Sequence, residues 1–256
     1  MHSDALAQPE SVIAADALTL WSDTEASPVV RDLSHWVGEG RWADQEKWRR
    51  IGQEHFGMYE KLCSMANMPR PIKNMLEWGP GGGANAIAFT NEVQTFWGAD
   101  ISAGNLEECM NQLQVSGFNR FRPILVDVSK PEAVLKSLTE QIDFFLCTAV
   151  SQHFPSKEYG TRVTQIAYRA LADNGIALIQ NRYDDGTPAV KSKNRDYFNN
   201  VVTFTSYSIE EYWEIARRVG FTPLSVLLQP LSNYAYYLLH KTPKNLNNPN
   251  LPAAVS

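Results

Sequence analysis

The chain has 256 residues, of which 44% are apolar and 11% aromatic, and its net charge is −5. Such a chain can bury a sizeable core, and its length suits one large α/β domain with additions or two small domains. The negative charge disfavours a protein that holds nucleic acid through phosphate contacts. Cys63, Cys109 and Cys147 form no CxxC pair, which disfavours a zinc cluster or a disulfide framework and favours reduced thiols in a cytoplasmic protein.

The sequence predicts neither a signal peptide nor a membrane helix. The first twenty residues lack the basic segment and the apolar run of a signal peptide. No apolar run approaches the ~20 residues that a membrane helix needs. We expect residues 1–30 to form a flexible N-terminal segment that is partly disordered or contains a short helix, and residues 241–256, rich in Asn and Pro, to form a disordered tail.

Residues 31–70 are predicted to form a helical cap. Apolar side chains recur at steps of three and four between Trp48 and Leu62, which is the pattern of one helix face. Trp36 and Trp42 precede this helix. These aromatic residues either pack the helix onto the core, which is the commoner use of Trp, or belong to a lid over a pocket.

Strands and helices alternate through a predicted domain of residues 71–240. The predicted strands are Asn74–Trp78, Gln94–Ala99, Phe121–Val126, Ile142–Cys147 and Ile176–Gln180. Gly175 is expected to cap the helix before the fifth strand, and Ser208 and Glu211 form a capping box at the start of the last helix. A hairpin of Leu224–Leu228 and Ala235–Leu239 follows. The pattern predicts a Rossmann-like, doubly wound α/β fold: a mostly parallel seven-stranded sheet with a terminal antiparallel hairpin.

The stretch MLEWGPGGGANAIAF, Met75 to Phe89, joins the first predicted strand to its helix. Four glycines and a proline occupy Gly79–Gly83. Glycine destabilises regular structure and leaves the backbone bare, so we expect something to lie directly against this loop. Ligands of parallel sheets bind at the carboxyl ends of the strands, where the loop is placed. The loop satisfies both GxGxxA, typical of dinucleotide binding, and ExGxGxG, which cradles S-adenosylmethionine.

Two acids at the ends of strands help to separate these cofactors. Asp100 ends the second predicted strand, where a carboxylate can accept both ribose hydroxyls, and Asp127 ends the third, where it can accept from an adenine amino group. The first predicted strand begins only at Asn74, whereas in dinucleotide-binding domains the first strand commonly lies close to the start of the domain. No basic residue lies in the glycine loop to meet a pyrophosphate. These features favour an adenosine that lies across three strand ends.

The order of Glu77, the glycines, Asp100, Asp127 and the strand Asp143-Phe144-Phe145 resembles the class I S-adenosylmethionine-dependent methyltransferases over about residues 70–240. The resemblance implies that the glycine loop touches the methionyl part, Asp100 the ribose and Asp127 the adenine. The cofactor residues that it implies are Glu77, Gly79, Gly81, Gly83, Asp100, Ile101, Asp127, Val128 and Thr148. An NAD(P)-binding oxidoreductase and a non-catalytic cofactor-binding protein stay as alternatives.

The acceptor is expected beside CTAVSQHFPSKEY, after the fourth strand. His153 is the candidate general base because imidazole titrates near neutrality, and Gln152 is a candidate to orient a polar acceptor. After the fifth strand, Tyr183 and Asp184 are candidate substrate-binding residues. Asp184 and Asp185 either make a turn or bind sugar hydroxyls or a divalent cation such as Mg²⁺, with His153 as a possible third ligand. No metal site is assigned.

The segments QHFPSKEY, RYDDG and NYAYYLL also resemble bacterial sugar and polysaccharide methyltransferases. This resemblance implies O-methylation of a saccharide hydroxyl. The rival is a C- or O-methyltransferase for a natural product or lipid, in which His153 serves structure. The N/D-P-P-Y/F motif of many N-methylating relatives is missing, which disfavours amino and nucleic-acid acceptors. The sequence therefore predicts a small-molecule or saccharide partner and leaves the oligomeric state open.

Overall fold

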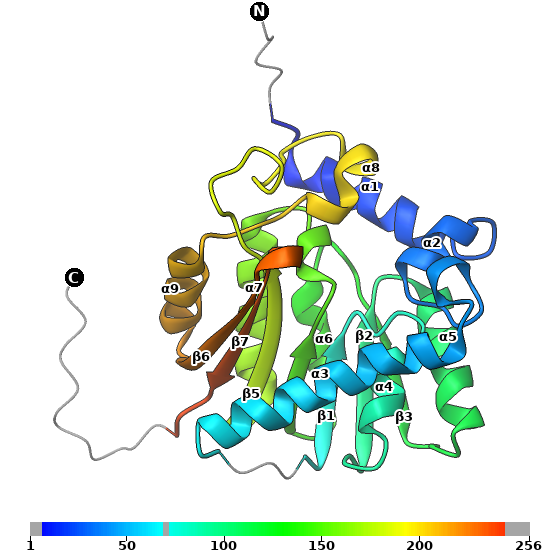
Figure 1. Cartoon of the computed structure of the whole chain (residues 1–256), viewed down its shortest axis with the longest axis vertical. Helices are drawn as coiled ribbons and strands as arrows, with labels where there is room; N and C mark the ends of the chain where they lie inside the picture. The colour runs from blue at the N-terminus through cyan, green and yellow to red at the C-terminus, as the bar shows by residue number, and fades with distance from the viewer. Residues whose placement is uncertain (1–6, 69–71, 244–256) are drawn as a thin grey trace, which may run out of the picture.

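A computed structural model describes residues 7–68 and 72–243, and its centre is one seven-stranded sheet (Figure 1). The strands are β1 Asn74–Trp78, β2 Thr95–Asp100, β3 Phe121–Leu125, β4 Ile142–Cys147, β5 Leu171–Arg182, β6 Thr222–Gln229 and β7 Tyr234–His240. The first five are parallel, and β7 runs antiparallel to both β5 and β6. The predicted Rossmann-like fold with a terminal antiparallel hairpin is confirmed.

The strand order β3-β2-β1-β4-β5-β7-β6 reverses at β1, which pairs with β2 on one side and β4 on the other. Every residue of β1 is buried, as expected for a parallel strand that helices cover on both faces. Ligands of such sheets bind at the carboxyl ends of the strands where the order reverses. The glycine loop leaves β1 at this point.

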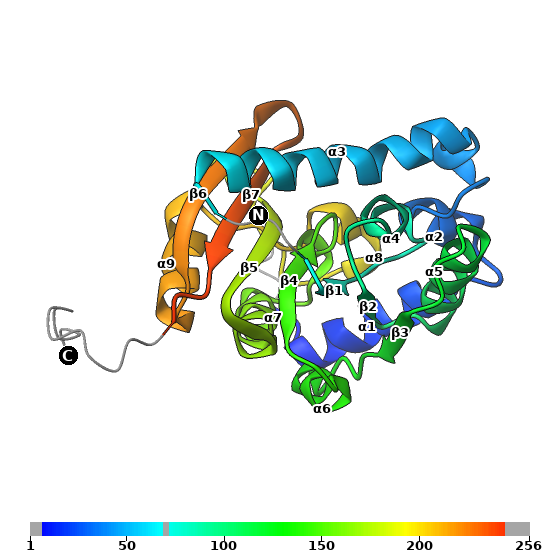
Figure 2. The same ribbon diagram turned by 90° about the horizontal axis from the view of Figure 1, so that it is seen from below.

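Helices cover both faces of the sheet (Figures 1 and 2). Their bounds are α1 Glu10–Ser22, α2 Pro28–Leu33, α3 Gln45–Met65, α4 Ala84–Phe89, α5 Ala103–Val115, α6 Val134–Ser137, α7 Lys157–Ala170, α8 Tyr197–Asn200 and α9 Ile209–Val219. One core cluster joins α3, α4 and α5 to the sheet, and a second joins α6, α7 and α9 to its opposite face. None of the helices within the described ranges has the length and apolar character needed to cross a membrane.

Of the two alternatives for the N-terminal segment, partial disorder and a short helix, the structure shows a helix. Glu10–Ser22 form a helix that buries Ile13, Ala17 and Trp21 against α8 and its neighbours. These three residues are spaced by four, so they form one stripe along a helix face. Apolar residues such as Val12 and Leu18 also occupy exposed positions of this helix, so no single apolar face stands out in its sequence. Residues 1–6 lie outside the described part, as does the predicted tail from residue 244 onward.

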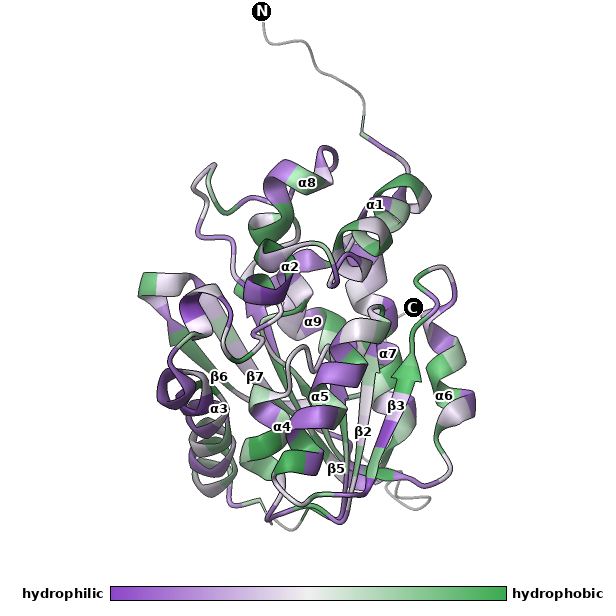
Figure 3. Cartoon of the chain, turned by 90° about the vertical axis from the view of Figure 1, so that its right-hand side faces the viewer, coloured by the Kyte–Doolittle hydropathy of each residue, from purple (hydrophilic) through white to green (hydrophobic). Residues whose placement is uncertain are grey.

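The predicted cap of residues 31–70 divides into two parts with different positions. The long helix α3 runs along a face of the sheet, where Tyr59 and Leu62 pack with Met75 and Phe89 (Figure 2). Its outward side is hydrophilic, in contrast to the apolar strands (Figure 3). The elements above the carboxyl ends of the strands are α1, α2 and α8 (Figure 1). Helix α3 is therefore a core helix and not a lid.

Two local predictions at helix ends have opposite outcomes. The capping box of Ser208 and Glu211 is confirmed. The expected cap at Gly175 is wrong, because α7 ends at Ala170 and Leu171 is already extended, with φ −68° and ψ 141°. Strand β5 begins at Leu171, and the predicted turn, residues 172–175, lies within it. The extra residues cause a register shift in the pairing of β5 with β4, between the pairs Ile142–Leu171 and Phe144–Ile176. Strand β5 is consequently longer at both ends than the predicted Ile176–Gln180.

Candidate active site

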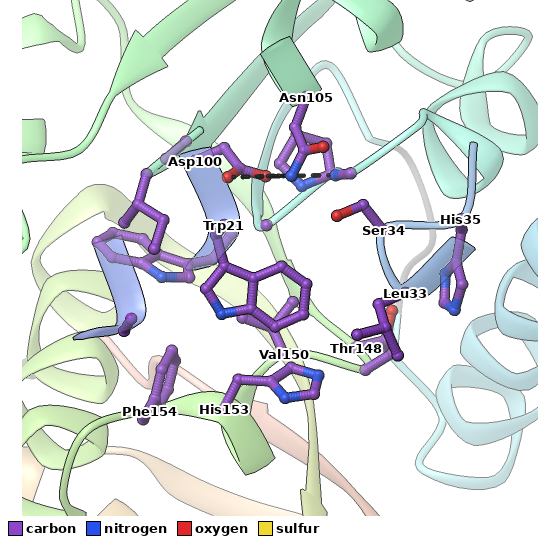
Figure 4. A pocket seen from close by; sticks show the side chains of 18 of the residues that line it. Trp21, Leu33, Ser34, His35, Asp100, Asn105, Thr148, Val150, His153 and Phe154 are labelled. Carbon is purple, nitrogen blue, oxygen red and sulfur yellow. Dashed lines mark hydrogen bonds between the residues drawn. The ribbon is translucent and has the colours of Figure 1, made fainter. Parts of the chain in front are cut away.

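A pocket lies at the carboxyl ends of β1, β2 and β4, beneath the cap of α1, α2 and α8 (Figure 4). Its empty space, with the open solvent of the mouth included, is about 860 Å³. Trp21 comes from α1, Asp100 from the end of β2, His153 from the loop after β4 and Tyr197 from α8. Segments far apart in the sequence, from α1 to α8, therefore meet around one cavity.

The glycine loop forms one wall of this pocket through Gly79 and Gly81. Both have left-handed backbone, with φ 75° and 52°, which disfavours a side chain. A Cβ atom at Gly79 would lie 2.4 Å from Val150 Cγ2, and one at Gly81 would lie 2.4 Å from the Ser34 carbonyl oxygen. Gly83 packs on Cys109 and does not line the pocket. The sequence predicts that something lies directly against this loop, and at Gly81 that neighbour is the backbone of Ser34.

Asp100 reaches the pocket with its carboxylate and is 7% exposed. Its Oδ1 accepts from the backbone N–H of Ser102 at 2.9 Å, and its Oδ2 faces Gly81 N and Asn105 Nδ2, each at 3.4 Å. Burial raises the pKa of Asp100 to about 6, although the hydrogen bonds from Ser102 and Gly81 lower it in part. Ile101 lines the pocket beside it. Asn105, which the sequence analysis did not identify, is thus part of the site.

Asp127 lies outside the pocket lining, whereas its neighbour Val128 is part of it. The Asp127 side chain is exposed, and its Oδ1 accepts from the backbone N–H and the hydroxyl of Ser129, at 2.9 and 2.6 Å. These bonds to Ser129 lower the pKa of Asp127. The carboxylate closes a local turn here. Asp127 is thus absent from the pocket lining, and its predicted contact with adenine stays a prediction.

Glu77 lies beneath the pocket and is fully buried. Its Oε1 accepts from Asn85 Nδ2 at 2.6 Å, and its Oε2 has no partner within the described part of the chain. Burial raises the pKa of Glu77 to about 8. Asn85 also donates to Thr148 Oγ1 at 2.9 Å and accepts from His55 Nδ1 at 2.8 Å. Thr148, a predicted cofactor residue, lines the pocket together with Asn85 and His55. Glu77 lies beneath them and holds Asn85 through its hydrogen bond.

Asn85 and His55 were not predicted as site residues. His55 falls on the apolar face of α3, so its periodicity indicates packing and conceals its polar contacts. Asn85 follows the glycine loop in the first turn of α4, where its polar side chain within ANAIAF was the available signal.

His153 lines the opposite end of the pocket. Its Nδ1 lies 2.7 Å from the Val201 carbonyl oxygen, so Nδ1 carries the proton and Nε2 the lone pair. Gln152 Nε2 lies 3.3 Å from that Nε2. Burial lowers the pKa of His153 to about 4, although the carbonyls of Val201 and Ala149 favour the charged form. The imidazole is therefore neutral near pH 7.

Aromatic side chains surround His153. The Trp21 indole lies with its centroid 4.8 Å from that of the imidazole. Its Nε1 donates to Tyr197 Oη at 2.9 Å, and this hydroxyl donates to the His153 carbonyl at 2.7 Å. Phe154 and Tyr159 line the same end of the pocket. Neither Trp21 nor Tyr197 was predicted as a site residue, since Trp21 lies in the N-terminal segment and Tyr197 in the insert after β5.

The remaining predicted substrate residues do not line the pocket. Gln152 is buried beside His153, and its Oε1 has no partner among the described residues. Tyr183 and Asp184 lie outside the lining. Asp184 Oδ1 accepts from Gly186 N at 2.8 Å, which is the turn interpretation of this segment. In the described ranges, no group of three or more His, Cys, Asp or Glu residues is arranged to hold a metal ion.

The cofactor end of the pocket fits an adenosylated ligand. The buried Asp100 carboxylate can accept from ribose hydroxyls, Ile101 and Val128 offer apolar surface to a flat ring, and the bare backbone of Gly79 and Gly81 leaves room for an arm. Residues 76–179 match a family model described as a methyltransferase domain. The domain that this match covers is that of an S-adenosylmethionine-dependent methyltransferase, and S-adenosylmethionine is its cofactor. The match decides between the two cofactors that the glycine pattern had left open.

Solved structures of methyltransferases share this fold. An S-adenosylmethionine-dependent methyltransferase from Clostridium acetobutylicum has a TM-score of 0.56 at 13% identity, over 78% of this chain and 93% of that one. The N-methyltransferase NodS from Bradyrhizobium japonicum, in complex with S-adenosyl-L-homocysteine, has 0.55 at 12%, over 75% and 87%. Phosphoethanolamine N-methyltransferase 2 from Haemonchus contortus has 0.60 at 14%, over 89% and 61%. A search of curated protein sequences finds no match.

Proposed function

We propose that the chain transfers the methyl group of S-adenosylmethionine to a hydroxyl oxygen of a small, uncharged acceptor. The observation that carries this proposal is the group of aromatic rings around the neutral His153. We call this group the acceptor chamber; it consists of Trp21, His153, Phe154, Tyr159 and Tyr197. Aromatic walls bind flat apolar faces, and polar groups fix the orientation of the ligand. A phenol or a ring hydroxyl of a natural product has this combination.

The charge of the lining supports an uncharged acceptor. Among the described residues that line the pocket there is no Lys or Arg, and Asp100 is the one acid. An anionic acceptor would lose its hydration here without gaining a cation in return. The Haemonchus enzyme was solved with phosphomonomethylethanolamine, a phosphorylated acceptor. The lining of this pocket argues against an acceptor of that kind for this chain.

The side chains of the chamber have a direct part in the reaction. Bound S-adenosylmethionine supplies a methyl carbon on a positively charged sulfur. The chamber has to hold the acceptor oxygen ~3 Å from that carbon and in line with its bond to sulfur. The hydroxyl becomes strongly acidic as its oxygen gains the methyl group, so a weak base can take the proton late. His153 suits this task, because Nδ1 is tied to the Val201 carbonyl and Nε2 keeps its lone pair.

A saccharide hydroxyl is the second candidate acceptor. The Trp21 ring favours it, since indoles also stack on the apolar faces of sugars. Tyr183 and Asp184, which were expected to bind a sugar, do not line the pocket. We therefore place a saccharide after an aromatic or alicyclic alcohol.

A methyl-acceptor screen with isotopically labelled S-adenosylmethionine tests the proposal. The panel contains phenols, alicyclic alcohols, mono- and oligosaccharides, amines and phosphorylated amines, each with Mg²⁺ and with a chelator. We expect label in an uncharged hydroxyl compound, equal in both conditions. Transfer is expected to fall in His153→Ala and to persist in the control His240→Ala, which alters a histidine of β7 outside the pocket. Transfer confined to amines or phosphorylated compounds would contradict the proposal.

A further inference from the structure

A segment of the N-terminal cap lies directly on the glycine loop. We call residues 32–36 the strap. The Ser34 carbonyl accepts from Gly82 N at 2.7 Å. A Cβ atom at Gly82 would lie 2.4 Å from the His35 carbonyl oxygen, so no space separates strap and loop. The strap is thus a wall of the cofactor end of the pocket, which both Ser34 and His35 line.

Three indole N–H groups hold the strap in place. Trp42 Nε1 donates to the Asp32 carbonyl at 2.7 Å and Trp48 Nε1 to the His35 carbonyl at 2.6 Å. Trp36, which belongs to the strap itself, donates from Nε1 to Asn105 Oδ1 at 2.9 Å. His35 has left-handed backbone, with φ 58°, which is strained for a residue other than glycine. Such a conformation persists where its surroundings fix it. These bonds therefore make the position of Ser34 well defined.

The glycine loop itself has no backbone donor left for a ligand. Pro80 has no N–H, and each of the four glycines already donates its N–H to another part of the chain. The bonds are Gly79 N to Ala99 O at 2.7 Å, Gly81 N to Asp100 Oδ2 at 3.4 Å, Gly82 N to Ser34 O at 2.7 Å and Gly83 N to Pro80 O at 2.9 Å. A charged group that rests on this loop therefore finds no free backbone donor at Gly79–Gly83 and needs a donor from a neighbouring group.

Ser34 offers such a donor. Its side chain is buried, with 7% of the residue exposed, and its Oγ has no partner within the described part of the chain. Figure 4 shows its hydroxyl directed into the pocket, on the side of Asp100 and Asn105. Buried polar groups are almost always hydrogen-bonded in native proteins, so an unpaired hydroxyl at a binding site points to a ligand atom as its partner.

We propose that the Ser34 hydroxyl binds the amino-acid arm of S-adenosylmethionine by donating to its carboxylate. The pocket lining has no Lys or Arg among the described residues, so a neutral donor has to meet this charge. A hydrogen bond to a carboxylate is stronger than one between neutral groups. Ser34 lies outside the motifs that assigned the other cofactor residues. The proposal concerns the cofactor alone and holds for any acceptor.

Calorimetry with two ligands tests this contact. S-adenosylhomocysteine contains the amino-acid arm, whereas 5′-methylthioadenosine has the same adenosine and sulfur without it. Ser34→Ala is expected to raise the Kd for S-adenosylhomocysteine about tenfold, as the loss of one charge-assisted hydrogen bond implies, and to leave the Kd for 5′-methylthioadenosine unchanged. Ser34→Thr, which keeps a hydroxyl, is expected to restore most of the affinity.

Ser27→Ala is the matched control. Ser34 follows the last residue of α2, and Ser27 precedes its first residue. The Oγ of Ser27 accepts from Val30 N at 3.3 Å, and Ser27 lies outside the pocket. Both Kd values are expected to stay at wild-type level. An unchanged Kd of Ser34→Ala for S-adenosylhomocysteine overturns the proposal. Equal weakening of both ligands overturns it too, because a general disturbance of the pocket would then explain the loss. Ser34→Gly repeats the measurement if Ser34→Ala does not fold.

Discussion

The indole of Trp21 lies on the imidazole of His153, with 4.8 Å between the ring centroids. One ring comes from the first helix, and the other from the loop after β4. Tyr197 of α8 connects the two, since it accepts from the indole and donates to the His153 carbonyl. The N-terminal helix, the insert after β5 and the loop after β4 therefore form one unit around the acceptor chamber.

Trp21→Ala is expected to raise the acceptor KM by about tenfold or more, because it removes a wall of the chamber and the contact area of a buried aromatic ring. The Kd for S-adenosylhomocysteine is expected to change less than twofold, as measured by calorimetry. Trp213→Ala on α9, which removes a half-buried Trp outside the pocket, is the control for a general loss of stability. If Trp21→Ala keeps the wild-type KM, the acceptor binds elsewhere.

His153→Ala is expected to lower kcat by about 10²–10³, the usual contribution of a general base, with cofactor affinity intact. The pKa of His153 is lowered to about 4 by burial, so the imidazole is neutral and basic throughout pH 6–8. With S-adenosylmethionine saturating at every pH, so that protonation of Asp100 does not limit binding, the wild-type rate should be flat in that range and should fall only as the pH approaches 4 and Nε2 gains a proton. Single-turnover rates between pH 4.5 and 8.5 check this. A rate that halves near pH 6.5 would mean that His153 titrates like an exposed histidine.

The cofactor end of the site was largely predictable from the sequence. Gly79, Gly81 and Asp100 each follow a strand that the alternating pattern identifies, and the topology of a doubly wound sheet brings strand ends together. Asp127 shows the limit of this reasoning. It also follows a strand, but Ser129 is close enough in sequence to hold its carboxylate in a turn.

The acceptor end was not predictable in the same way. Trp21 precedes the alternating pattern and Tyr197 lies in the insert between β5 and α9, and they meet only through tertiary packing. No rule of periodicity or turn chemistry relates two such segments. Ser34 was hidden for a similar reason, since its place beside the glycine loop depends on three Trp side chains whose partners are backbone carbonyls and an amide.

Asp100→Asn tests the ribose contact and its pH dependence. Burial raises the pKa of Asp100 to about 6, so the wild-type carboxylate is ionised at pH 7.5 and takes up a proton as the pH falls through 6. Protonation removes an acceptor oxygen, and the wild-type affinity for S-adenosylhomocysteine should fall on the acid side. Asp100→Asn is expected to cost about 1–3 kcal/mol of binding at pH 7.5, to approach the wild type at pH 5 and to show a flat profile. Titration calorimetry at four pH values measures both curves. Equal affinities at pH 7.5 would remove Asp100 from the ribose contact.

Gly52 and Gly57 on α3 form a matched pair that tests how the core positions the glycine loop. A Cβ atom at Gly52 would lie 2.0 Å from the Ala84 carbonyl oxygen at the start of α4, whereas one at Gly57 would meet nothing within 4 Å. Gly52→Ala is expected to lower the free energy of unfolding by about 1–3 kcal/mol and to weaken cofactor binding, because α4 follows the loop directly. Gly57→Ala is expected to raise that free energy by about 0.5–1 kcal/mol, since alanine favours a helix interior. Urea denaturation separates the two variants. Equal midpoints would contradict the close contact of α3 with α4, since the two substitutions differ only in what the added methyl group touches.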